Sequence, residues 1–248
     1  MTNIVTAADK MAELIEQDSL ILPFAGRFGI LMNFRDKSIE TVCREYDIDV
    51  SMFLCLLNTY INRAYSPEIS ECRFMPSDLI PFLKNSHDYF LEAYFGELGA
   101  LLARIFDSRT GSCHDDDNLI IGFFKTYKRE MMTHFESEEK ETFPYIASLS
   151  AATKSDAGRE RHRALYGESG KEILNDTHYE LEMKISDLKS LIIRYVTCKH
   201  MSADIYNLMF TAARFERDMH NHIQIEERVL IPIARMIEKR LKNTYAQQ

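Results

Sequence analysis

Two stretches of this sequence place a histidine and a glutamate at the end of the same apolar pattern. The first, HFESEEKETFP, begins at His134, and the second, HIQIEERVLIP, begins 88 residues later at His222. In both, glutamates follow the histidine after four and five residues, and a proline follows after ten. Composition does not explain a frame repeated in this way, so it predicts two equivalent structural elements.

Each frame ends an apolar stripe with helical spacing, whose members are alternately four and three residues apart. This spacing places them on one face of an α-helix. The first stripe is Ile120, Phe124, Tyr127, Met131, His134 and Glu138, and the second is Leu208, Ala212, Phe215, Met219, His222 and Glu226. The histidines and glutamates therefore face a core, where a carboxylate is costly unless a positive charge pairs with it. A metal ion would supply that charge.

The rest of the chain also has the periodicity of helices, and no alternating strand pattern is convincing. Long helical patterns cover roughly residues 78–107, 117–147, 165–197 and 202–242. Their connections are short, long and short, and the long one is the polar stretch 148–170. This order is typical of a four-helix up-down bundle made of two antiparallel hairpins. We predict an all-α fold, with a small helical N-terminal module over residues 1–75 and the bundle over residues 76–248.

The hairpin lengths bring two further histidines to the level of the frames. His87 begins the first long helix, and the chain runs about 20 residues to the turn and a similar number back to His134. From His178 the chain likewise runs about 20 residues to a turn and a similar number back to His222. Their stripes continue through Phe90, Tyr94, Leu98, Leu101 and Ile105 in the first helix and through Leu181, Ile185, Leu188, Ile192 and Tyr195 in the third. The predicted metal ligands are His87, His134, Glu138, His178, His222 and Glu226.

Six ligands of this kind are too many for one tetrahedral zinc ion. Imidazoles with two carboxylates that can bridge suit two metal ions, with iron as the leading candidate and manganese or a mixed pair as alternatives. A single histidine on an apolar face is more often a hydrogen-bonded core residue, and a single HxxxE is common. The duplication of frame, stripe and hairpin length is what favours a metal centre.

The remaining histidines are predicted to lie outside the site. His114 and His162 fall in polar connections, His200 at the far end of the last hairpin, and His220 points away from the ligand stripe. Glu139 and Glu227 turn off the stripe and are expected to be solvated or to orient a ligand imidazole. Tyr127 could line the pocket, although core packing is its expected role.

The composition of the chain argues against several classes of function and of cellular location. A net charge of -8 argues against a nucleic-acid partner, because binding phosphates requires a basic face. Five cysteines without a CxxC pair predict a reducing cytoplasm rather than a disulfide framework. The N-terminus lacks a signal-peptide pattern, and no apolar run approaches the length of a membrane span. We therefore expect a soluble cytoplasmic protein.

The repeated H…HxxxEE…P pattern from His87 to Pro232 resembles the hemerythrin-like (HHE) superfamily. Four histidines and two glutamates are similar to the iron–sulfur cluster repair branch, whereas oxygen-carrying hemerythrins use five histidines. The resemblance implies two non-haem iron ions with an oxo or hydroxo bridge. It implies that Glu138 and Glu226 bridge the irons and that the four histidines are terminal ligands.

The N-terminal segment also resembles that branch. Residues 39–43, IETVC, match its "LeeAC"-like segment. Where the branch has two adjacent cysteines, this chain has Asn33 and Phe34, so a thiol role of that pair is not carried over.

The resemblance implies a protein of the nitrosative and oxidative stress response that supports the repair of damaged iron–sulfur clusters. It would donate iron or bind nitric oxide or oxygen, and damaged iron–sulfur proteins would be its partners. The alternative is a sensor that reports oxygen, nitric oxide or redox state to a regulatory protein. The stretch KSIETVCREYDIDVSMFLCLLN could be a helix-turn-helix, but it has no basic recognition helix. A third alternative is an oxygen-activating or nitric-oxide-reducing enzyme, which carboxylate-rich sites would suit better.

Overall fold

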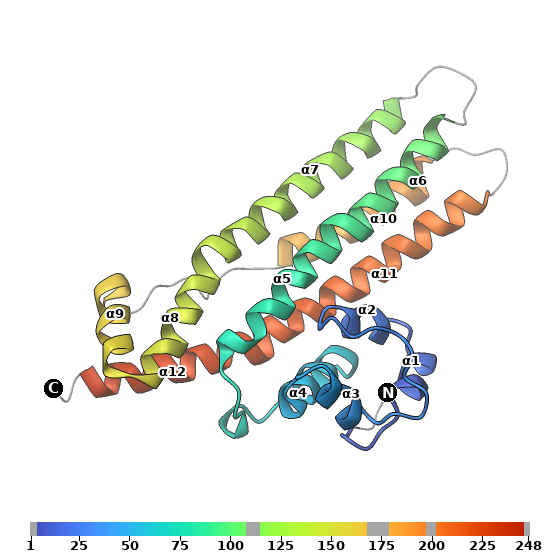
Figure 1. The fold of residues 1–248 in the computed structure, drawn as a ribbon. Coiled ribbons are helices and arrows are strands. Elements are labelled where there is room, and N and C mark those ends of the chain that lie inside the picture. Colours follow the sequence, from blue (N-terminus) through green and yellow to red (C-terminus); the bar gives the residue numbers. More distant parts are fainter. Residues whose placement is uncertain (1–3, 108–114, 168–178, 197–201, 246–248) are drawn as a thin grey trace. The chain divides into compact units, whose positions relative to one another are not determined.

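The computed structural model describes residues 4–107, 115–167, 179–196 and 202–245. Over these residues every regular element is a helix, and β structure is limited to an isolated bridge between Lys10 and Ser38 (Figure 1). The predicted all-α fold is confirmed.

Four short helices form the N-terminal part of the chain: α1 (Met11–Gln17), α2 (Ile21–Gly26), α3 (Ile39–Glu45) and α4 (Val50–Ile61). The side chain of Ser38 accepts a hydrogen bond from the N–H of Thr41 and so caps α3. Asp49 caps α4 in the same way, accepting from the N–H of Met52 at 2.7 Å. These caps satisfy backbone donors that a helix N-terminus leaves without partners.

An aromatic cluster holds the short helices together. The ring of Phe24 is fully buried and lies 4.9 to 5.5 Å, between ring centroids, from four other aromatic rings. These rings belong to Phe28, Phe53, Tyr60 and Phe82. Because aromatic rings bury large apolar areas, this cluster supplies much of the local core.

Three of the four long helical patterns are divided into several segments. The first contains η2 (Pro76–Leu79), α5 (Ile80–Tyr89), η3 (Phe90–Tyr94) and α6 (Phe95–Asp107), and the second α7 (Asp115–Ser137), η4 (Glu138–Thr142) and α8 (Phe143–Lys154). After α9 (Asp156–Tyr166) come α10 (Tyr179–Tyr195), α11 (Ala203–Ile225), η6 (Glu226–Leu230) and α12 (Ile231–Tyr245). A short 3-10 helix, η1 (Ile69–Glu71), precedes them all, and η3, η4 and η6 are π-helical.

The polar stretch 148–170 differs from the prediction of a connection. Residues to Lys154 continue α8, and α9 follows at once, capped by Ser155, whose side chain accepts from the N–H of Gly158 at 3.0 Å. The third helix does not begin near residue 165, because α9 ends at Tyr166 and α10 begins at Tyr179. The stretch is polar because most of α9 faces solvent.

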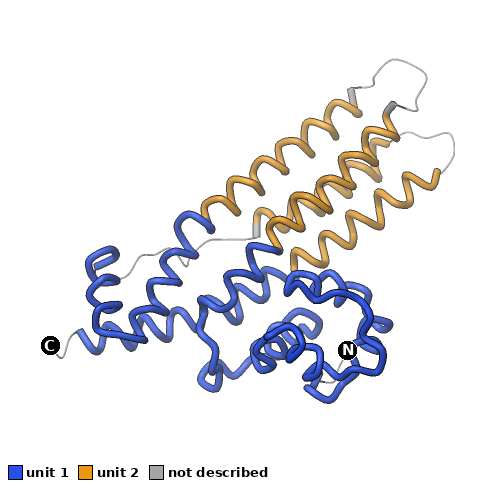
Figure 2. The backbone as a smooth tube through the Cα atoms, viewed as in Figure 1, with its two compact units in different colours: residues 1–85, 138–176, 221–248 blue, residues 86–137, 177–220 orange. Residues whose placement is uncertain are grey.

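The chain forms two compact units (Figure 2). The first unit comprises residues 1–85, 138–176 and 221–248, and the second comprises residues 86–137 and 177–220. In the first unit the N-terminal helices share one apolar core with α8 and α12. The predicted domain boundary between residues 75 and 76 remains a prediction.

The second unit is a four-helix arrangement with most members of the predicted stripes inside, although Leu181 in α10 is only half-buried. Every member of the first stripe from Phe90 to Ile105 is buried, as are the α7 stripe from Ile120 to Met131 and the α11 stripe from Leu208 to Met219. Ion pairs join neighbouring helices: Lys184 with Glu130, Lys189 with Glu216, and Arg104 with Asp204. Tyr195 departs from the prediction, because its side chain is 41% exposed near the end of α10.

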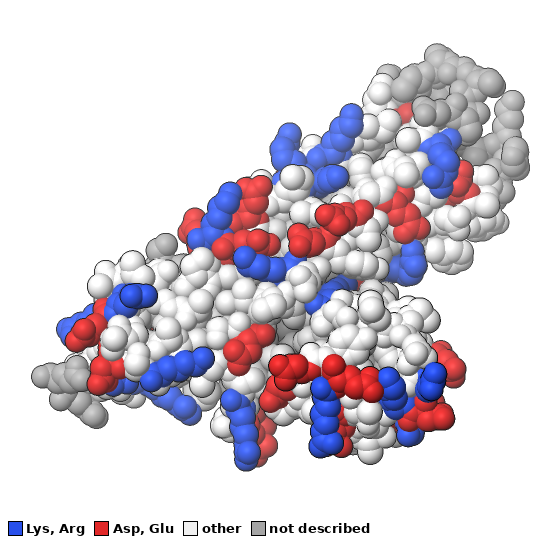
Figure 3. All heavy atoms as spheres, viewed as in Figure 1, with Lys and Arg blue, Asp and Glu red and all other residues white. Residues whose placement is uncertain are grey.

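Charged side chains of both signs are mixed on one face of the molecule (Figure 3). On the face shown in Figure 3, lysines and arginines alternate with aspartates and glutamates, and no broad basic area is visible.

Candidate metal centre

Both glutamates of the repeated frame begin a π-helical turn. Glu138 begins η4 and Glu226 begins η6. In each case a proline, Pro144 or Pro232, lies two residues after the turn ends. A proline has no N–H to donate, and its ring crowds the carbonyl of the residue four positions earlier, so the regular helix has to widen or bend before it. The prolines of the frame thus give a local reason for π turns, which occur often at functional sites.

The predicted ligands on these helices are mostly buried. His222 is 1% exposed and Glu226 is 2% exposed, while Glu138 is 5% exposed. His134 is the exception, because it is only half-buried at the end of α7. Within α11 and η6, Nε2 of His222 lies 3.4 Å from Oε1 of Glu226, so the histidine and glutamate of that frame face the same space.

Packing fixes the orientation of His87. Its imidazole is 1% exposed and is stacked on the ring of Phe135, with 4.0 Å between ring centroids and an interplanar angle of 6°. Phe135 immediately follows His134 in α7. A stacked imidazole has little rotational freedom, which favours its use as a pre-oriented ligand.

Three of the six predicted ligands come together. His87, His222 and Glu226 each offer one ligand atom, and these atoms all lie within 4.8 Å of one another. Two imidazoles and a carboxylate are the donors that iron, manganese and zinc accept in proteins. A buried carboxylate without a compensating positive charge would be destabilising. The residues therefore fit a divalent or trivalent cation.

The structure describes two of the other three predicted ligands, Glu138 and His134. Glu138 is buried at the start of its π turn, as Glu226 is, but within the described part of the chain neither it nor His134 belongs to the group of converging ligand atoms. His178 lies outside the described residues. The full set of six remains a prediction.

Of the other four histidines, the structure describes His220 and His162. His220 points to Glu182, with which Nδ1 forms a hydrogen bond, and so it is not part of the ligand group. His162 was expected in a polar connection but is 3% exposed in α9, where Nδ1 lies 3.0 Å from the hydroxyl of Ser148. Burial lowers the pKa of His162. His114 and His200 lie outside the described residues.

Of the residues next to the ligands, Glu227 and Tyr127 lie as predicted, whereas Glu139 forms an ion pair with a lysine. Glu227 is exposed, and Glu139 lies 3.7 Å from the ammonium group of Lys84 in an ion pair. Tyr127 is buried, and its ring packs at 5.4 Å from that of Phe95. Burial raises the pKa of the Tyr127 hydroxyl, and the carboxylates of Glu216, Glu130 and Glu182 add to this effect.

Sequence reasoning missed one buried carboxylate near the frame. Asp218 is fully buried in α11 and accepts a hydrogen bond from the hydroxyl of Tyr94 at 3.1 Å. It lies four residues before His222, at helical spacing. That spacing was the available signal, but an aspartate beside a stripe is usually exposed, so it did not stand out.

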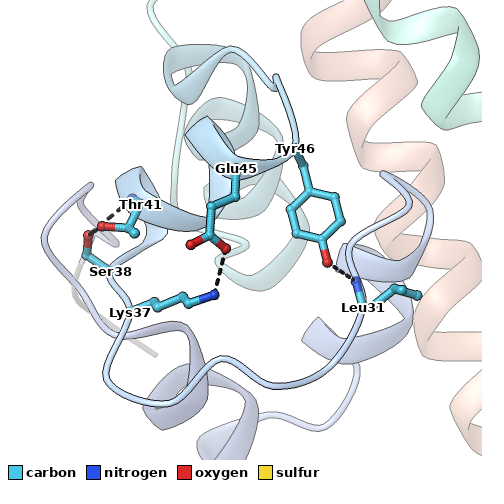
Figure 4. Close-up of polar contacts among 6 residues, drawn as sticks. All are labelled: Leu31, Lys37, Ser38, Thr41, Glu45 and Tyr46. Atoms are coloured by element: carbon cyan, nitrogen blue, oxygen red, sulfur yellow. Dashed lines mark hydrogen bonds and ion pairs between the residues drawn. The ribbon is translucent and has the colours of Figure 1, made fainter.

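The two residues that stand where the similar branch has adjacent cysteines line a small hollow. Asn33 and Phe34 lie in the loop between α2 and α3, and the hollow there has a volume of about 130 Å³. At its rim the hydroxyl of Tyr46 accepts from the N–H of Leu31 at 3.0 Å, and Lys37 pairs with Glu45 at 2.6 Å (Figure 4). Neither Asn33 nor Phe34 carries a thiol, so the structure offers no thiol at these two positions.

An all-helical chain with a buried His–His–Glu group belongs to the class of helical cation-binding proteins. The family model described as hemerythrin HHE cation-binding domain matches residues 78–234. The chain belongs to this family. No curated protein and no solved structure matched the chain. Within the described ranges, no helix is both long and apolar enough to cross a membrane.

Proposed function

We propose that this protein binds two non-haem iron ions and acts in the response to nitrosative and oxidative stress. The supporting observation is the group of three buried ligands, His87, His222 and Glu226, inside the segment that the cation-binding family covers. His134, Glu138 and His178 would complete the set. Iron bound there would supply a redox-active centre with positions open to oxygen or nitric oxide.

The chain's own residues would determine how the iron is held. The stack of His87 on Phe135 orients one imidazole, and the π turn at Glu226 directs the carboxylate toward His222. Apolar side chains fill the helices around these ligands and exclude water. A histidine-rich set in such surroundings favours reversible ligand binding and iron release over hard oxidation.

The more specific part of the proposal is support for the repair of damaged iron–sulfur clusters, by iron donation or by binding nitric oxide or oxygen. It rests on the four-histidine, two-glutamate pattern and on the segment IETVC at residues 39–43. Damaged iron–sulfur proteins would be the partners, and the cytoplasm would be the site of action.

A sensor is the second candidate, and one contact favours it. Arg228 lies in the π turn that Glu226 begins, and its guanidinium donates to the backbone carbonyls of Arg63 and Tyr65. A change at Glu226 would therefore be transmitted to the segment that follows α4. A regulatory protein bound to the N-terminal helices could respond to it.

Metal analysis of the full chain, purified without chelators, tests the iron centre. We expect about two irons per chain, near-ultraviolet absorption that changes on reduction, and further spectral changes with nitric oxide or oxygen. Absence of iron after anaerobic reconstitution would overturn the proposal.

Iron transfer separates the two candidates. If the loaded protein restores activity to a cluster-depleted iron–sulfur enzyme and loses iron in proportion, the repair role is supported. If it retains its iron and instead co-purifies with a regulator in a nitric-oxide-dependent manner, the sensor is supported.

A further inference from the structure

A row of aromatic rings joins the ligand His87 to a buried tyrosine. The imidazole of His87 is stacked on Phe135, whose ring lies 6.1 Å, between centroids, from that of Phe90. The ring of Phe90 in turn lies 6.2 Å from that of Tyr94. All four side chains belong to the second unit and are at most 3% exposed. Closely packed rings let an electron tunnel more readily than a gap does, so the row is a path between Tyr94 and the ligand group.

The hydroxyl of Tyr94 has a proton acceptor in place. It donates to Oδ2 of Asp218 at 3.1 Å, and Asp218 is fully buried. The ring of Tyr94 is also stacked on that of Phe215, with 5.1 Å between centroids. A tyrosine that gives up an electron loses its phenolic proton as well, and a carboxylate within hydrogen-bond reach can receive that proton as a general base. The pair is therefore arranged for the electron and the proton to leave together.

The π turn η3 brings Tyr94 next to Tyr89. Their rings form a T-shaped contact with 5.3 Å between centroids. In a regular α-helix, two residues five positions apart point about 140° away from each other. In η3 the N–H of Phe95 donates to the carbonyl of Phe90, five residues earlier, and this wider turn directs Tyr94 toward Tyr89. Tyr89 is half-buried, so the row of rings reaches solvent there.

We propose that Tyr94 is a redox-active tyrosine, which gives one electron to an oxidised metal ion held by His87 and its phenolic proton to Asp218. The products are a neutral tyrosyl radical, a protonated Asp218 and a metal ion reduced by one electron. The oxidant is iron that hydrogen peroxide has oxidised, so this link rests on the proposed function. A one-electron reductant such as ascorbate then returns an electron through Tyr89, and the proton goes back from Asp218 to Tyr94.

The relay protects the ligand group. An oxidising equivalent that stays at a metal ion reacts with the nearest side chains, which here are two imidazoles and a carboxylate. Transfer to Tyr94 and on to Tyr89 moves it to a position that dissolved reductants can reach. The protein can then meet peroxide repeatedly without losing its ligands.

Light-driven oxidation of the full chain tests the tyrosine without relying on iron. Tris(bipyridine)ruthenium(III), generated by a laser flash with a sacrificial electron acceptor, takes one electron from tyrosine. Transient absorption, and electron paramagnetic resonance after rapid freezing, record the radical. We expect a long-lived tyrosyl radical in the unsubstituted protein and its loss in Tyr94→Phe, because radicals on exposed tyrosines decay quickly by coupling to one another.

Tyr127→Phe is the matched control. Tyr127 is also buried in the second unit, but its hydroxyl has no hydrogen-bond partner among the described residues. Without a proton acceptor it should not form the radical, so the yield in Tyr127→Phe should equal that of the unsubstituted protein. Asp218→Asn, shown to be folded by circular dichroism, should lower the yield by more than half. An undiminished yield in Tyr94→Phe or in Asp218→Asn would overturn the proposal.

A measurement on the unsubstituted protein keeps the role of Asp218 testable if Asp218→Asn does not fold. Electron–nuclear double resonance of the frozen radical should detect the proton of the hydrogen bond between Tyr94 and Asp218. This coupling should disappear after exchange into deuterium oxide. A long-lived radical without an exchangeable coupled proton would contradict proton transfer to Asp218.

Hydrogen peroxide added to protein loaded with ferrous iron tests the link to the metal. We expect the same radical as with light, and its loss in Phe90→Leu, which interrupts the row of rings but retains Tyr94 and Asp218. The light-driven radical should persist in this variant.

Iron content, measured before peroxide is added, separates the possible failures. If the protein contains iron and peroxide gives no radical on Tyr94, the link to the metal is wrong. If the protein binds no iron, the proposed function is wrong, and the light-driven experiment alone decides whether Tyr94 is redox-active.

Discussion

Buried carboxylates carry most of the functional information at the scale of single residues. Glu138, Asp218 and Glu226 are each at most 5% exposed. Asp218 accepts a hydrogen bond from the hydroxyl of Tyr94 at 3.1 Å. Glu226 instead faces two imidazoles, which are themselves metal ligands in many proteins. The two imidazoles beside Glu226 are what point to a cation at this carboxylate.

Glu226→Gln should lower metal affinity by tenfold or more, because the amide keeps the volume but removes the negative charge of a ligand. The control is Glu227→Gln, one residue further along η6, whose side chain is exposed and should leave affinity unchanged. Iron content after dialysis against a graded chelator series measures both. Equal iron retention in the two variants would remove Glu226 from the site.

His162 should make the stability of the protein depend on pH. Its folded-state pKa is lowered, chiefly by burial, with Glu238 opposing. The unfolded chain therefore binds more protons between the folded pKa and about 6.5, and stability rises with pH across that window. Above it the full stability is present, and it is lost as the pH falls.

Thermal unfolding of His162→Gln between pH 5 and 8 checks this expectation. The variant should show a smaller loss of Tm on acidification than the unsubstituted protein, since the titrating group is gone. An identical pH profile in both proteins would show that other groups cause the dependence.

At the scale of elements, the π turns connect the local sequence, a glutamate followed by a proline, to the position of the predicted metal ligands. Two of the three π turns, η4 and η6, begin at the glutamate of a frame and end two residues before its proline. A π turn is less favourable than a regular helical turn, and it persists when tertiary contacts or a proline require it. Here the turn changes the direction of the residues around the glutamate relative to a regular helix.

Pro144→Ala and Pro232→Ala should therefore weaken metal binding while leaving the helices intact. Alanine restores the backbone N–H and removes the clash of the proline ring with the carbonyl four residues earlier. The backbone hydrogen bonds can then return to the regular α-helical pattern, which would displace the glutamate. The metal-free variants should melt at the same temperature or higher, with a lower iron content.

The ring of Pro144 is exposed, so its loss removes little packing, and Pro67, outside the helices, serves as the control substitution. Metal analysis together with circular dichroism measures the effect. Full iron content in both variants would show that the turns are maintained without the prolines.

At the scale of the whole molecule, the ligands lie on helices that also build the apolar cores. In the first unit, α8 and α12 continue directly from η4 and η6 and share one core with the N-terminal helices. Metal binding and folding are therefore linked, because the cation compensates charges that the folded chain keeps away from water.

Removal of the metal should lower the melting temperature. A ligand at 100 times its Kd stabilises the folded state by about 2.7 kcal/mol, and each kcal/mol shifts the Tm of a chain of this size by roughly 2 to 4 °C. We expect a drop of about 5 to 10 °C on chelation, restored by adding ferrous iron under anaerobic conditions. A Tm that is unaffected by chelation, in protein shown to contain iron beforehand, would contradict the linkage.

Periodicity in the sequence predicted the long helices and most of their buried faces. The stripes that contain Tyr127 and Phe215 were predicted from spacing alone, and their side chains are buried. Spacing failed at α9, because a surface helix with one packed face has a composition close to that of a loop. It also said nothing of the π turns, since a hydrogen-bond shift of one residue leaves no separate pattern in the sequence.

By itself, the sequence determined the all-α fold, the paired frames and the candidate ligands, because apolar periodicity and residue chemistry are local properties that act within one helix. The tertiary structure decided which of these residues meet. It brought together His87, His222 and Glu226, whose ligand atoms all lie within 4.8 Å of one another. Such contacts depend on how separate helices and turns pack, which no single segment encodes.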